Sequence, residues 1–322
     1  MLSTGMIVGT GVFALVLILL LWIERWPWTI VRLSTLQALK WLGLGRTITG
    51  GAHGVFYARW GPRYVLILKK LAGIFGERGK HWMEETYHGK VLTPELANAI
   101  ITIEEDVPLQ ELGKRVIPFD RAREIFLDSS TSIVVTDCVC KRGSHDLKKA
   151  PCKLVDEPYQ VCMFVGNPSL CDFLIDHKPK TSYRLSKEEA LEVLKFSHEK
   201  GLVHNAWFKD CIKDQFYVIC NCCPCCCLGF DSMKYGINQL VSSGYVATVD
   251  EDRCSGCGTC KSICPFQAVE IVESKDKSKS VVQWEKCYGC SVCVDKCKKG
   301  ARSLELDEKK GLPLYVRTLT KT

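Results

Sequence analysis

The chain has 322 residues, which is enough for two small domains and one additional segment. Charged residues make up 25% of it, which argues against a protein that crosses a membrane many times, and a net charge of +7 indicates a solvated surface rather than a nucleic-acid-binding stripe. Twenty residues are cysteine, a density that implies either disulfide bonds or bound metal.

The N-terminal segment, residues 1–24, is predicted to be a transmembrane anchor. Residues Met6 to Ile23 form a run of 18 almost entirely apolar residues. As a helix this run spans about 27 Å, close to the thickness of the hydrocarbon core. The alternatives are a cleaved signal peptide and a buried core helix. A signal peptide needs a basic segment before the apolar run, and no Lys or Arg precedes this one, so a retained span is favoured.

The cations nearest to this segment predict its orientation. They all follow the apolar run: Arg25, Arg32, Lys40 and Arg46. The positive-inside rule then places the N-terminus outside and the rest of the chain in the cytoplasm. Thiolate ligands persist best in a reducing compartment, which agrees with this orientation. We therefore expect a single-pass protein of the cell membrane with cytoplasmic domains.

Residues 25–90 are expected to form a membrane-proximal helical segment. Between Trp28 and Leu44, apolar residues surround a narrow polar stripe. This stretch therefore either lies in the membrane interface or packs on a partner or on the folded part of the chain. The stretch from Tyr64 to Phe75 leaves the same alternatives open.

A cysteine-rich α/β domain is expected over residues 91–243. The predicted elements are a helix at Pro118–Leu127, a buried strand at Ser132–Thr136, a helix at Ser186–Lys200 and a strand at Phe216–Ile219. The second helix has the strongest signal, because Ser186 and Glu189 have the spacing of a capping box and Gly201 can end the helix.

Both predicted strands of this domain run directly into cysteines, which suggests that the cysteines converge. Six cysteines occur in the eight residues from Cys220 to Cys227, more than core packing explains. An additional iron–sulfur cluster is the favoured interpretation, while zinc or another thiophilic metal and a redox-active thiol or disulfide site remain open. Because adjacent side chains point apart, some of these cysteines are expected to be spectators or to serve a second cluster. The candidate ligands are Cys138, Cys140, Cys152, Cys162, Cys220, Cys222, Cys223 and Cys225.

Four motifs follow one another within residues 116–230 of this domain. They are a C-x-C pair, an S-K-E-E-A helix, the stretch Gly201–His204 and the run I-C-N-C-C-x-C-C. In this order they resemble a domain of poorly characterised iron–sulfur proteins, ferredoxin-like, from anaerobic microbes. The resemblance implies a metal-binding oxidoreductase module.

The strongest motif is a four-cysteine run that occurs twice near the C-terminus. The pattern C-x-x-C-x-x-C-x-x-x-C extends from Cys254 to Cys264 and again from Cys287 to Cys297. In chains with two such runs, three cysteines of a run bind one 4Fe-4S cluster and the fourth binds the other cluster. A zinc ribbon would leave half of these cysteines without a role. We predict that cluster 1 binds Cys254, Cys257, Cys260 and Cys297, and cluster 2 binds Cys287, Cys290, Cys293 and Cys264.

Short strands and helical turns are expected around these two runs. The strands are predicted at Tyr245–Val249, Val269–Val272, Val281–Trp284 and Leu304–Leu306, with helical turns after Cys260 and Cys293. Residues 244–307 therefore resemble a bacterial-type two-cluster ferredoxin, and residues 308–322 form a C-terminal tail. In one departure from a strict repeat, Pro265 follows Cys264 but Lys298 follows Cys297.

The expected fold class is α+β, with an N-terminal transmembrane helix, a cysteine-rich α/β middle domain and a C-terminal ferredoxin-like dicluster domain. No G-x-G-x-x-G fingerprint or phosphate loop supports a nucleotide cofactor. His145 and His204 are interpreted as local hydrogen-bonding residues rather than ligands.

The favoured function is a membrane-anchored iron–sulfur electron-transfer protein, or an electron-transfer component of a redox complex with redox protein partners. An electron carrier is favoured over a stand-alone oxidoreductase. Two other classes stay open: a reductase whose middle-domain cluster or thiols act on a small substrate, and a protein that handles metal or clusters.

Overall fold

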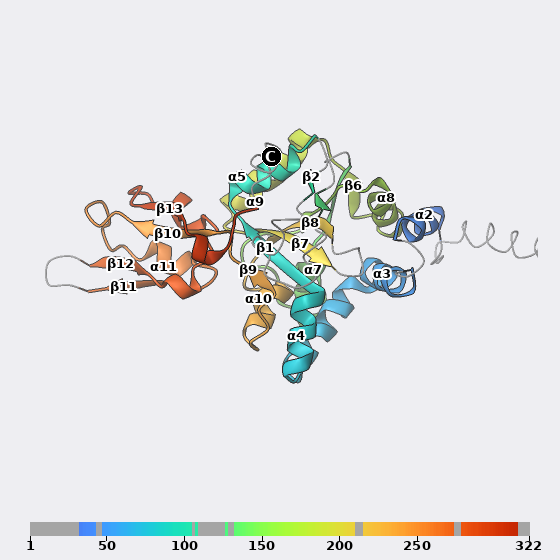
Figure 1. The fold of residues 1–322 in the computed structure, drawn as a ribbon, viewed down its shortest axis with the longest axis horizontal. Coiled ribbons are helices and arrows are strands. Elements are labelled where there is room, and N and C mark those ends of the chain that lie inside the picture. Colours follow the sequence, from blue (N-terminus) through green and yellow to red (C-terminus); the bar gives the residue numbers. More distant parts are fainter. Residues whose placement is uncertain are drawn as a thin grey trace, which may run out of the picture.

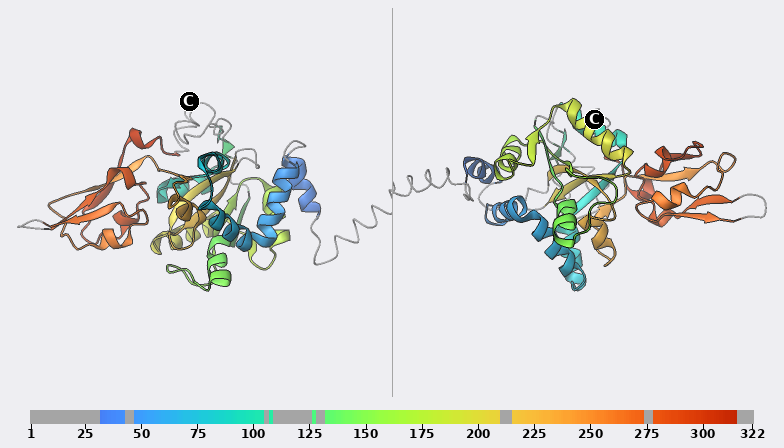
Figure 2. Two further views of the ribbon diagram at one scale, coloured as in Figure 1. Left: turned by 90° about the horizontal axis from the view of Figure 1, so that it is seen from below. Right: turned by 180° about the vertical axis from the view of Figure 1, so that it is seen from behind.

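The computed structural model of the chain describes residues 32–42, 47–104, 107–108, 126–127, 132–209, 215–273 and 278–314. Its largest element is a seven-stranded sheet with helices on both faces (Figure 1). A smaller C-terminal unit of two-stranded ribbons lies at one end of this sheet, and the helices α2, α3 and α8 lie toward the other end (Figure 2).

The central sheet has the strand order β6-β4-β5-β8-β7-β1-β9. All neighbouring strands are antiparallel except β1 and β9, which are parallel. The predicted strands at Ser132–Thr136 and Phe216–Ile219 are confirmed as β4 and β8. The strands are β1 (Tyr87–Leu92), β4 (Ile133–Asp137), β5 (Gln160–Val165), β6 (Ser182–Arg184), β7 (Val203–Lys209), β8 (Gln215–Cys222) and β9 (Leu240–Val241).

Side chains of the sheet alternate between two cores on its opposite faces. In β5, Met163 and Val165 join the core under helices α5 (Pro94–Ile101) and α9 (Lys187–Glu199), whereas Cys162 and Phe164 join the other core. This alternation follows from the two-residue period of a strand. The cysteine-rich core therefore occupies one face of the sheet.

The predicted helix at Ser186–Lys200 is confirmed as α9, and so is its capping box. The Ser186 side chain accepts a hydrogen bond from the Glu189 N–H, and the Glu189 carboxylate accepts one from the Ser186 N–H. These bonds satisfy amide groups that have no partner within the helix.

The cysteine-rich face of the sheet is covered by four helices, α3, α7, α8 and α10. A further helix, α4, directly precedes strand β1. The long helix α3 changes direction at Trp60, close to Pro62, and its central part packs on α7. The bounds are α3 (Thr47–Ala72), α4 (Glu77–Thr86), α7 (Val139–Lys148), α8 (Pro168–His177) and α10 (Leu228–Met233).

The described part of the stretch Trp28–Leu44 packs on the folded chain. It forms α2 (Leu33–Leu42), which contacts α3 and α8. Ala38 is buried with Ala58 and Phe173, and the Thr35 hydroxyl is 2.9 Å from Nε2 of His177.

Over the described residues, no helix combines the length and the apolar content that crossing a membrane requires. The longest of them, α3, has 26 residues and carries four cations and a proline. This finding contradicts the predicted fold class with its transmembrane helix and the predicted single-pass localisation in the cell membrane. The segment for which the anchor was predicted, residues 1–24, lies outside the described residues. The corrected fold class is α+β with a C-terminal ferredoxin-like unit.

The C-terminal unit contains two antiparallel ribbons, β10 with β13 and β11 with β12, and two short helices that follow the cysteine loops. Its strands confirm the predicted ones with small shifts, since Trp284 begins a 3₁₀ turn, η4, instead of ending a strand. The bounds are β10 (Tyr245–Val249), α11 (Thr259–Ile263), β11 (Val269–Val272), β12 (Lys279–Val282), η4 (Trp284–Lys286), α12 (Val292–Asp295), β13 (Arg302–Leu306) and η5 (Glu308–Lys310).

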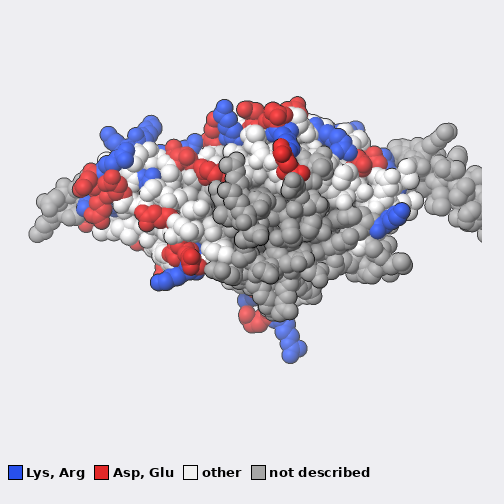
Figure 3. All heavy atoms as spheres, turned by 45° about the horizontal axis from the view of Figure 1, so that its top comes forward, with Lys and Arg blue, Asp and Glu red and all other residues white. Residues whose placement is uncertain are grey.

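Two further strands, β2 (Val107–Pro108) and β3 (Phe126–Leu127), form a separate ribbon. The predicted helix at Pro118–Leu127 is therefore wrong at its end, where β3 pairs with β2; the rest of it lies outside the described residues. On the face shown in Figure 3, cationic and anionic side chains are interspersed among the described residues.

Candidate metal centres

The eight cysteines of the C-terminal unit fall into two sets, each around its own cavity. The first cavity, of about 230 Å³, is lined by Cys254, Cys257, Cys260 and Cys297. The second is narrower, about 20 Å³, and is lined by Cys264, Cys287, Cys290 and Cys293. Each set combines three cysteines of one run with the fourth of the other. The structure thus brings together the residues predicted for clusters 1 and 2, and their ligation of iron stays a prediction.

The loops of the two runs depend on a glycine at the same position of each run. Gly256 and Gly289 both have positive φ, 65° and 64°. A side chain at Gly289 would also meet the Tyr245 carbonyl oxygen at 2.2 Å. Glycine therefore lets each loop curve closely over its cavity, which turns the C-x-x-C cysteines inward.

Backbone amides point at the sulfur atoms of three of these cysteines. The N–H groups of Ala247, Ala268 and Ala301 donate to the Sγ atoms of Cys287, Cys264 and Cys297, at 3.4, 3.3 and 3.3 Å. Hydrogen bonds to sulfur stabilise thiolates and tune the potential of an iron–sulfur cluster. Four inward thiols around a cavity, with amide donors behind them, fit the ligand shell of such a cluster.

The cysteines of the middle domain converge, as the sequence suggests, but they form two groups, and the eight predicted ligands are divided between them. The first is a six-thiol ring, in which every thiol is hydrogen-bonded to two others. The ring lines a cavity of about 80 Å³, walled also by Tyr57, Tyr87, Trp207 and Tyr217. In ring order its members are Cys138, Cys140, Cys227, Cys222, Cys220 and Cys162.

Sheet register explains how distant parts of the chain reach this ring. Cys162 of β5 lies opposite Cys220 of β8. Because strand side chains alternate, Cys220 and Cys222 point to the same face. Cys138 joins them because its N–H donates to the Tyr159 carbonyl at 2.8 Å, which fixes the start of α7 beside β5.

The second group, the four-thiol group, consists of Cys152, Cys223, Cys225 and Cys226, whose sulfur atoms all lie within 4.8 Å of one another. It is built by the turn after β8 and by the loop that carries Cys152. The boundary between the two groups falls between the neighbours Cys222 and Cys223, and again between Cys226 and Cys227. At the end of β8 the neighbours Cys222 and Cys223 thus serve different sites, as alternation along a strand leads one to expect, whereas in the turn that follows the neighbours Cys225 and Cys226 serve the same site.

One buried cation, Lys141, lies between the two groups. Its ammonium donates to Sγ of Cys223 at 3.4 Å and to the carbonyl of Asn221 at 3.2 Å. Burial lowers the pKa of Lys141, but Cys138, Cys223 and other thiols raise it more, to well above its usual value. Lys141 therefore stays cationic and compensates negative charge on the thiolates.

Hydrogen bonds within the ring favour thiolates at selected positions. Bonds from Cys220 and Cys227 lower the pKa of Cys222 to about 6. Bonds from Cys140 and Cys162 hold the pKa of Cys138 well below its ordinary value. Bonds to neighbouring thiols and burial raise the pKa of the other four ring thiols, those of Cys140, Cys162, Cys220 and Cys227. The thiolate is the metal-binding form of cysteine, so Cys138 and Cys222 are the two ring positions where that form is favoured without metal, and the others lose their protons when metal binds.

Sequence reasoning missed Cys226 and Cys227, which belong to the four-thiol group and to the six-thiol ring. Alternation along the strand would have assigned Cys222 and Cys223 to opposite sides. After Cys223 the chain turns, so alternation no longer predicts to which group Cys225, Cys226 and Cys227 belong. Cys171 lies apart from both groups, 3.7 Å from the Ser132 carbonyl, and Cys211 lies outside the described residues. His204 is hydrogen-bonded to Asn221, and His145 to Asp146.

Comparison with known proteins identifies the C-terminal unit. A 4Fe-4S dicluster domain family matches residues 247–298. A ferredoxin of Pyrobaculum islandicum is 36% identical over 78 residues, which cover 22% of this chain and 70% of that ferredoxin.

Two other similar proteins have longer chains. An iron-sulfur subunit of the CoB--CoM heterodisulfide reductase of Methanopyrus kandleri is 57% identical over 37 residues, 12% of this chain and 6% of that protein. One component of the Na(+)-translocating ferredoxin:NAD(+) oxidoreductase complex of Acetobacterium woodii is 43% identical over 51 residues, 16% of this chain and 14% of that protein. The chain thus spans a small fraction of these two proteins but more than two thirds of the ferredoxin. Through its C-terminal domain the chain belongs to the 4Fe-4S ferredoxins, and its cofactors are iron–sulfur clusters.

Proposed function

We propose that the chain relays electrons between redox partners through two 4Fe-4S clusters in the C-terminal unit and a further iron–sulfur cluster in the six-thiol ring. Cluster 1 uses Cys254, Cys257, Cys260 and Cys297, and cluster 2 uses Cys264, Cys287, Cys290 and Cys293. When bound, the clusters supply reversible one-electron chemistry. The chain's own residues hold the thiolates, exclude water and set the local charge.

The observation that carries this proposal is a shared core between the C-terminal unit and the middle domain. Cys290 and Val292, which lie two residues apart in the second run, are buried in the same core as the ring cysteines Cys138, Cys162 and Cys222. No solvent-filled gap therefore separates the cluster 2 loop from the middle domain along this contact.

Aromatic rings fill the contact between the two parts. Phe230 lies 4.9 Å from Phe266, and Phe266 stacks on Tyr288 at 4.3 Å between ring centroids. Phe266 and Tyr288 also line the cluster 2 cavity. Cluster 2 is accordingly the centre of the C-terminal unit that faces the middle domain.

Two polar contacts fix the same orientation. The His198 side chain at the end of α9 is hydrogen-bonded to Asp295, and the Lys296 ammonium donates to the Glu199 carbonyl at 2.6 Å. Cluster 1, whose ligand Cys257 is exposed, lies on the side available to a partner. The two larger relatives are named as parts of multi-protein redox enzymes, which supports a role with protein partners.

The ligand sets are tested with single cysteine-to-alanine variants of the full-length protein, purified without oxygen and reduced with dithionite. If the fourth cysteine of each run binds the cluster of the other run, Cys297→Ala should change the same EPR signal as Cys257→Ala. By the same reasoning, Cys264→Ala should change the same signal as Cys290→Ala. If Cys297→Ala instead changes the same EPR signal as Cys290→Ala, the assignment of Cys297 to cluster 1 is refuted.

The additional cluster is tested by iron and sulfide analysis of the same preparations. Cys222→Ala should remove iron and acid-labile sulfide together and leave both ferredoxin signals intact. A matched control is Cys171→Ala, which removes a buried cysteine outside every group. Unchanged sulfide in Cys222→Ala would show that the ring holds no iron–sulfur cluster, and the relay would then consist of the C-terminal unit alone.

A further inference from the structure

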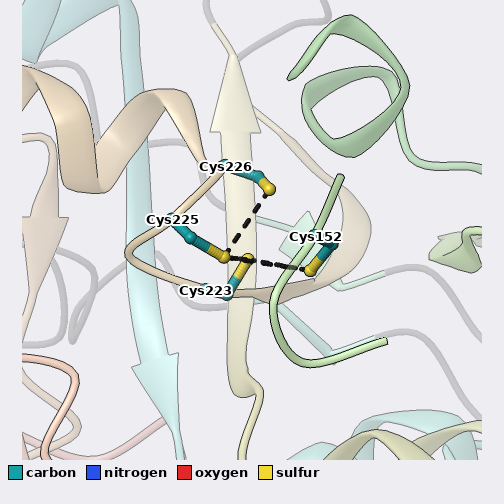
Figure 4. Close-up of side chains that lie close together, drawn as sticks. All are labelled: Cys152, Cys223, Cys225 and Cys226. Atoms are coloured by element: carbon teal, nitrogen blue, oxygen red, sulfur yellow. Dashed lines mark hydrogen bonds between the residues drawn. The ribbon is translucent and has the colours of Figure 1, made fainter. Parts of the chain in front are cut away.

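The four-thiol group is much more compact than the cluster sites of the C-terminal unit. The Sγ atoms of Cys223 and Cys225 are 3.1 Å apart, and those of Cys225 and Cys226 are 3.6 Å apart. Sγ of Cys152 lies 3.6 Å from Cys223 and 3.9 Å from Cys225. Figure 4 shows the four sulfur atoms turned toward one another, with Cys152 facing the other three from a separate loop.

This spacing matches a single metal ion. A tetrahedral zinc site has metal–sulfur bonds of about 2.3 Å, which puts its sulfur atoms about 3.8 Å apart. A four-iron cluster holds its ligands farther apart, because each thiolate binds a different iron atom.

The same structure offers an internal comparison. Each cysteine set of the C-terminal unit surrounds a cavity, and among the described residues neither set forms a group whose ligand atoms all lie within 4.8 Å of one another. The four-thiol group does, and its members do not line the ring cavity. Its sulfur atoms leave space for one ion and not for a cluster.

We propose that Cys152, Cys223, Cys225 and Cys226 bind one tetrahedral divalent ion, zinc or iron, in a site distinct from the cluster in the six-thiol ring. Four thiolates and one divalent cation leave a net charge of about −2. The buried ammonium of Lys141 lies 3.4 Å from Sγ of Cys223 and supplies part of the compensation.

A second cation contacts the turn that carries Cys226. The buried Lys69 ammonium donates to the carbonyl of Cys226 and lies 3.6 Å from a carboxylate oxygen of Asp231. The site ties the loop with Cys152 to the turn after β8, so bound metal would fix both beside α3. The identity of the ion decides its use: zinc would be structural, whereas iron would add a one-electron centre.

The test compares metal and sulfide contents of the full-length wild type with those of Cys225→Ser and Cys222→Ser. Cys225 is exposed, so its replacement is compatible with folding. We expect Cys225→Ser to lose one equivalent of zinc or iron while acid-labile sulfide stays unchanged. Cys222→Ser, the matched ring variant, should lose iron together with sulfide if the ring holds a cluster. The single-ion site is judged from metal loss in Cys225→Ser, and the ring cluster from sulfide loss in Cys222→Ser. Either proposal can therefore be refuted while the other is retained.

A second measurement keeps the proposal testable if the variant is poorly folded. Wild-type protein loaded with Co²⁺ should show the visible absorption bands of a tetrahedral cobalt tetrathiolate. Loss of sulfide in parallel with iron in Cys225→Ser would overturn the proposal in favour of a cluster. Absence of the cobalt bands, with no zinc or iron equivalent tied to Cys225, would overturn it in favour of free thiols.

Discussion

Arg302 is the residue that joins the two cluster sites of the ferredoxin domain. Its Nη2 donates to Sγ of Cys260 at 3.2 Å, and its Nη1 lies 3.9 Å from Sγ of Cys293. The side chain is buried, and the hydroxyl of Ser280 accepts a further bond at 3.0 Å. A guanidinium in this position interacts more strongly with a reduced cluster than with an oxidised one, because reduction adds negative charge.

Replacement of Arg302 should therefore lower the reduction potentials of both clusters. In Arg302→Met the cation and its bonds to sulfur are lost. If the two redox states differ by about 1.4 kcal/mol in this interaction, each potential falls by about 59 mV for one electron. EPR-monitored redox titration measures the shift.

Arg302→Lys is the matched control, since it keeps the charge but loses the planar fork that reaches both sulfur atoms. Its potentials should lie between those of the wild type and Arg302→Met. Unchanged potentials in Arg302→Met would mean that Arg302 only packs between the loops.

Strand β1 contains a lysine, Lys90, in the interior of the protein, where an unpaired charge is unfavourable. Lys90 is fully buried within it, and its ammonium has no hydrogen-bond partner among the described residues. Desolvation by burial lowers the pKa of Lys90 to about 7. At neutral pH this strand therefore holds a lysine that is about half neutral, and the unfolded chain binds the proton more tightly.

The stability of the sheet should consequently rise with pH above neutrality. Between the folded pKa of about 7 and the unfolded value of 10.5, the unfolded state binds more protons, so the free energy of unfolding increases with pH. From pH 7.5 to pH 9 the increase is roughly 2 kcal/mol, and well below pH 7, where both states bind the proton, this contribution is constant.

Lys90→Met should remove this slope and be more stable than the wild type at pH 7.5. Urea unfolding of both proteins at the two pH values checks the prediction. Parallel pH dependence of wild type and variant would mean that Lys90 does not titrate in this range.

Elements with local signals could be predicted from the sequence, and elements that depend on distant pairing could not. The capping box of Ser186 and the two cysteine runs are encoded within a few residues. The structure confirms the capping box and brings the cysteines of the runs together in two sets, while their ligation of iron stays a prediction. The division of the middle-domain cysteines into two groups depends on the strand register that puts Cys162 of β5 opposite Cys220 of β8. These two residues are 58 positions apart in the chain. An apolar run such as Met6–Ile23 carries a strong composition signal, yet the fold class built on it was contradicted.

On the scale of the whole molecule, the centres follow a linear order. Under the ligand assignments proposed above, cluster 1 lies toward the exposed Cys257, cluster 2 faces the middle domain, and the further cluster lies in the six-thiol ring of the middle-domain core. An electron that enters at cluster 1 should therefore pass through cluster 2 before it reaches the ring.

Loss of cluster 2 should slow electron transfer to the six-thiol ring more than loss of cluster 1 does. After mixing with a reduced ferredoxin-type donor, reduction of the ring cluster should be slower in Cys290→Ala than in Cys257→Ala by roughly tenfold, which corresponds to about 1.4 kcal/mol in the barrier. Rapid-freeze EPR follows the ring signal. Equal rates in the two variants would show that electrons reach the ring by another route.

The place of Cys162 and Cys220 in the interior of the sheet also constrains the biogenesis of the protein. Both residues belong to strands with hydrogen-bonded neighbours on each side, β5 and β8. Their side chains project from the cysteine-rich face, where residues of α3 and α4 wall the ring cavity. Under the assignments proposed above, iron and sulfide are therefore delivered before these helices close over that face. The four-thiol group, with Cys225 at the surface, can be filled afterwards. Maturation would then proceed from the inside outward, and scarcity of iron during synthesis would leave α3 and α4 undocked from a sheet whose strands are already paired.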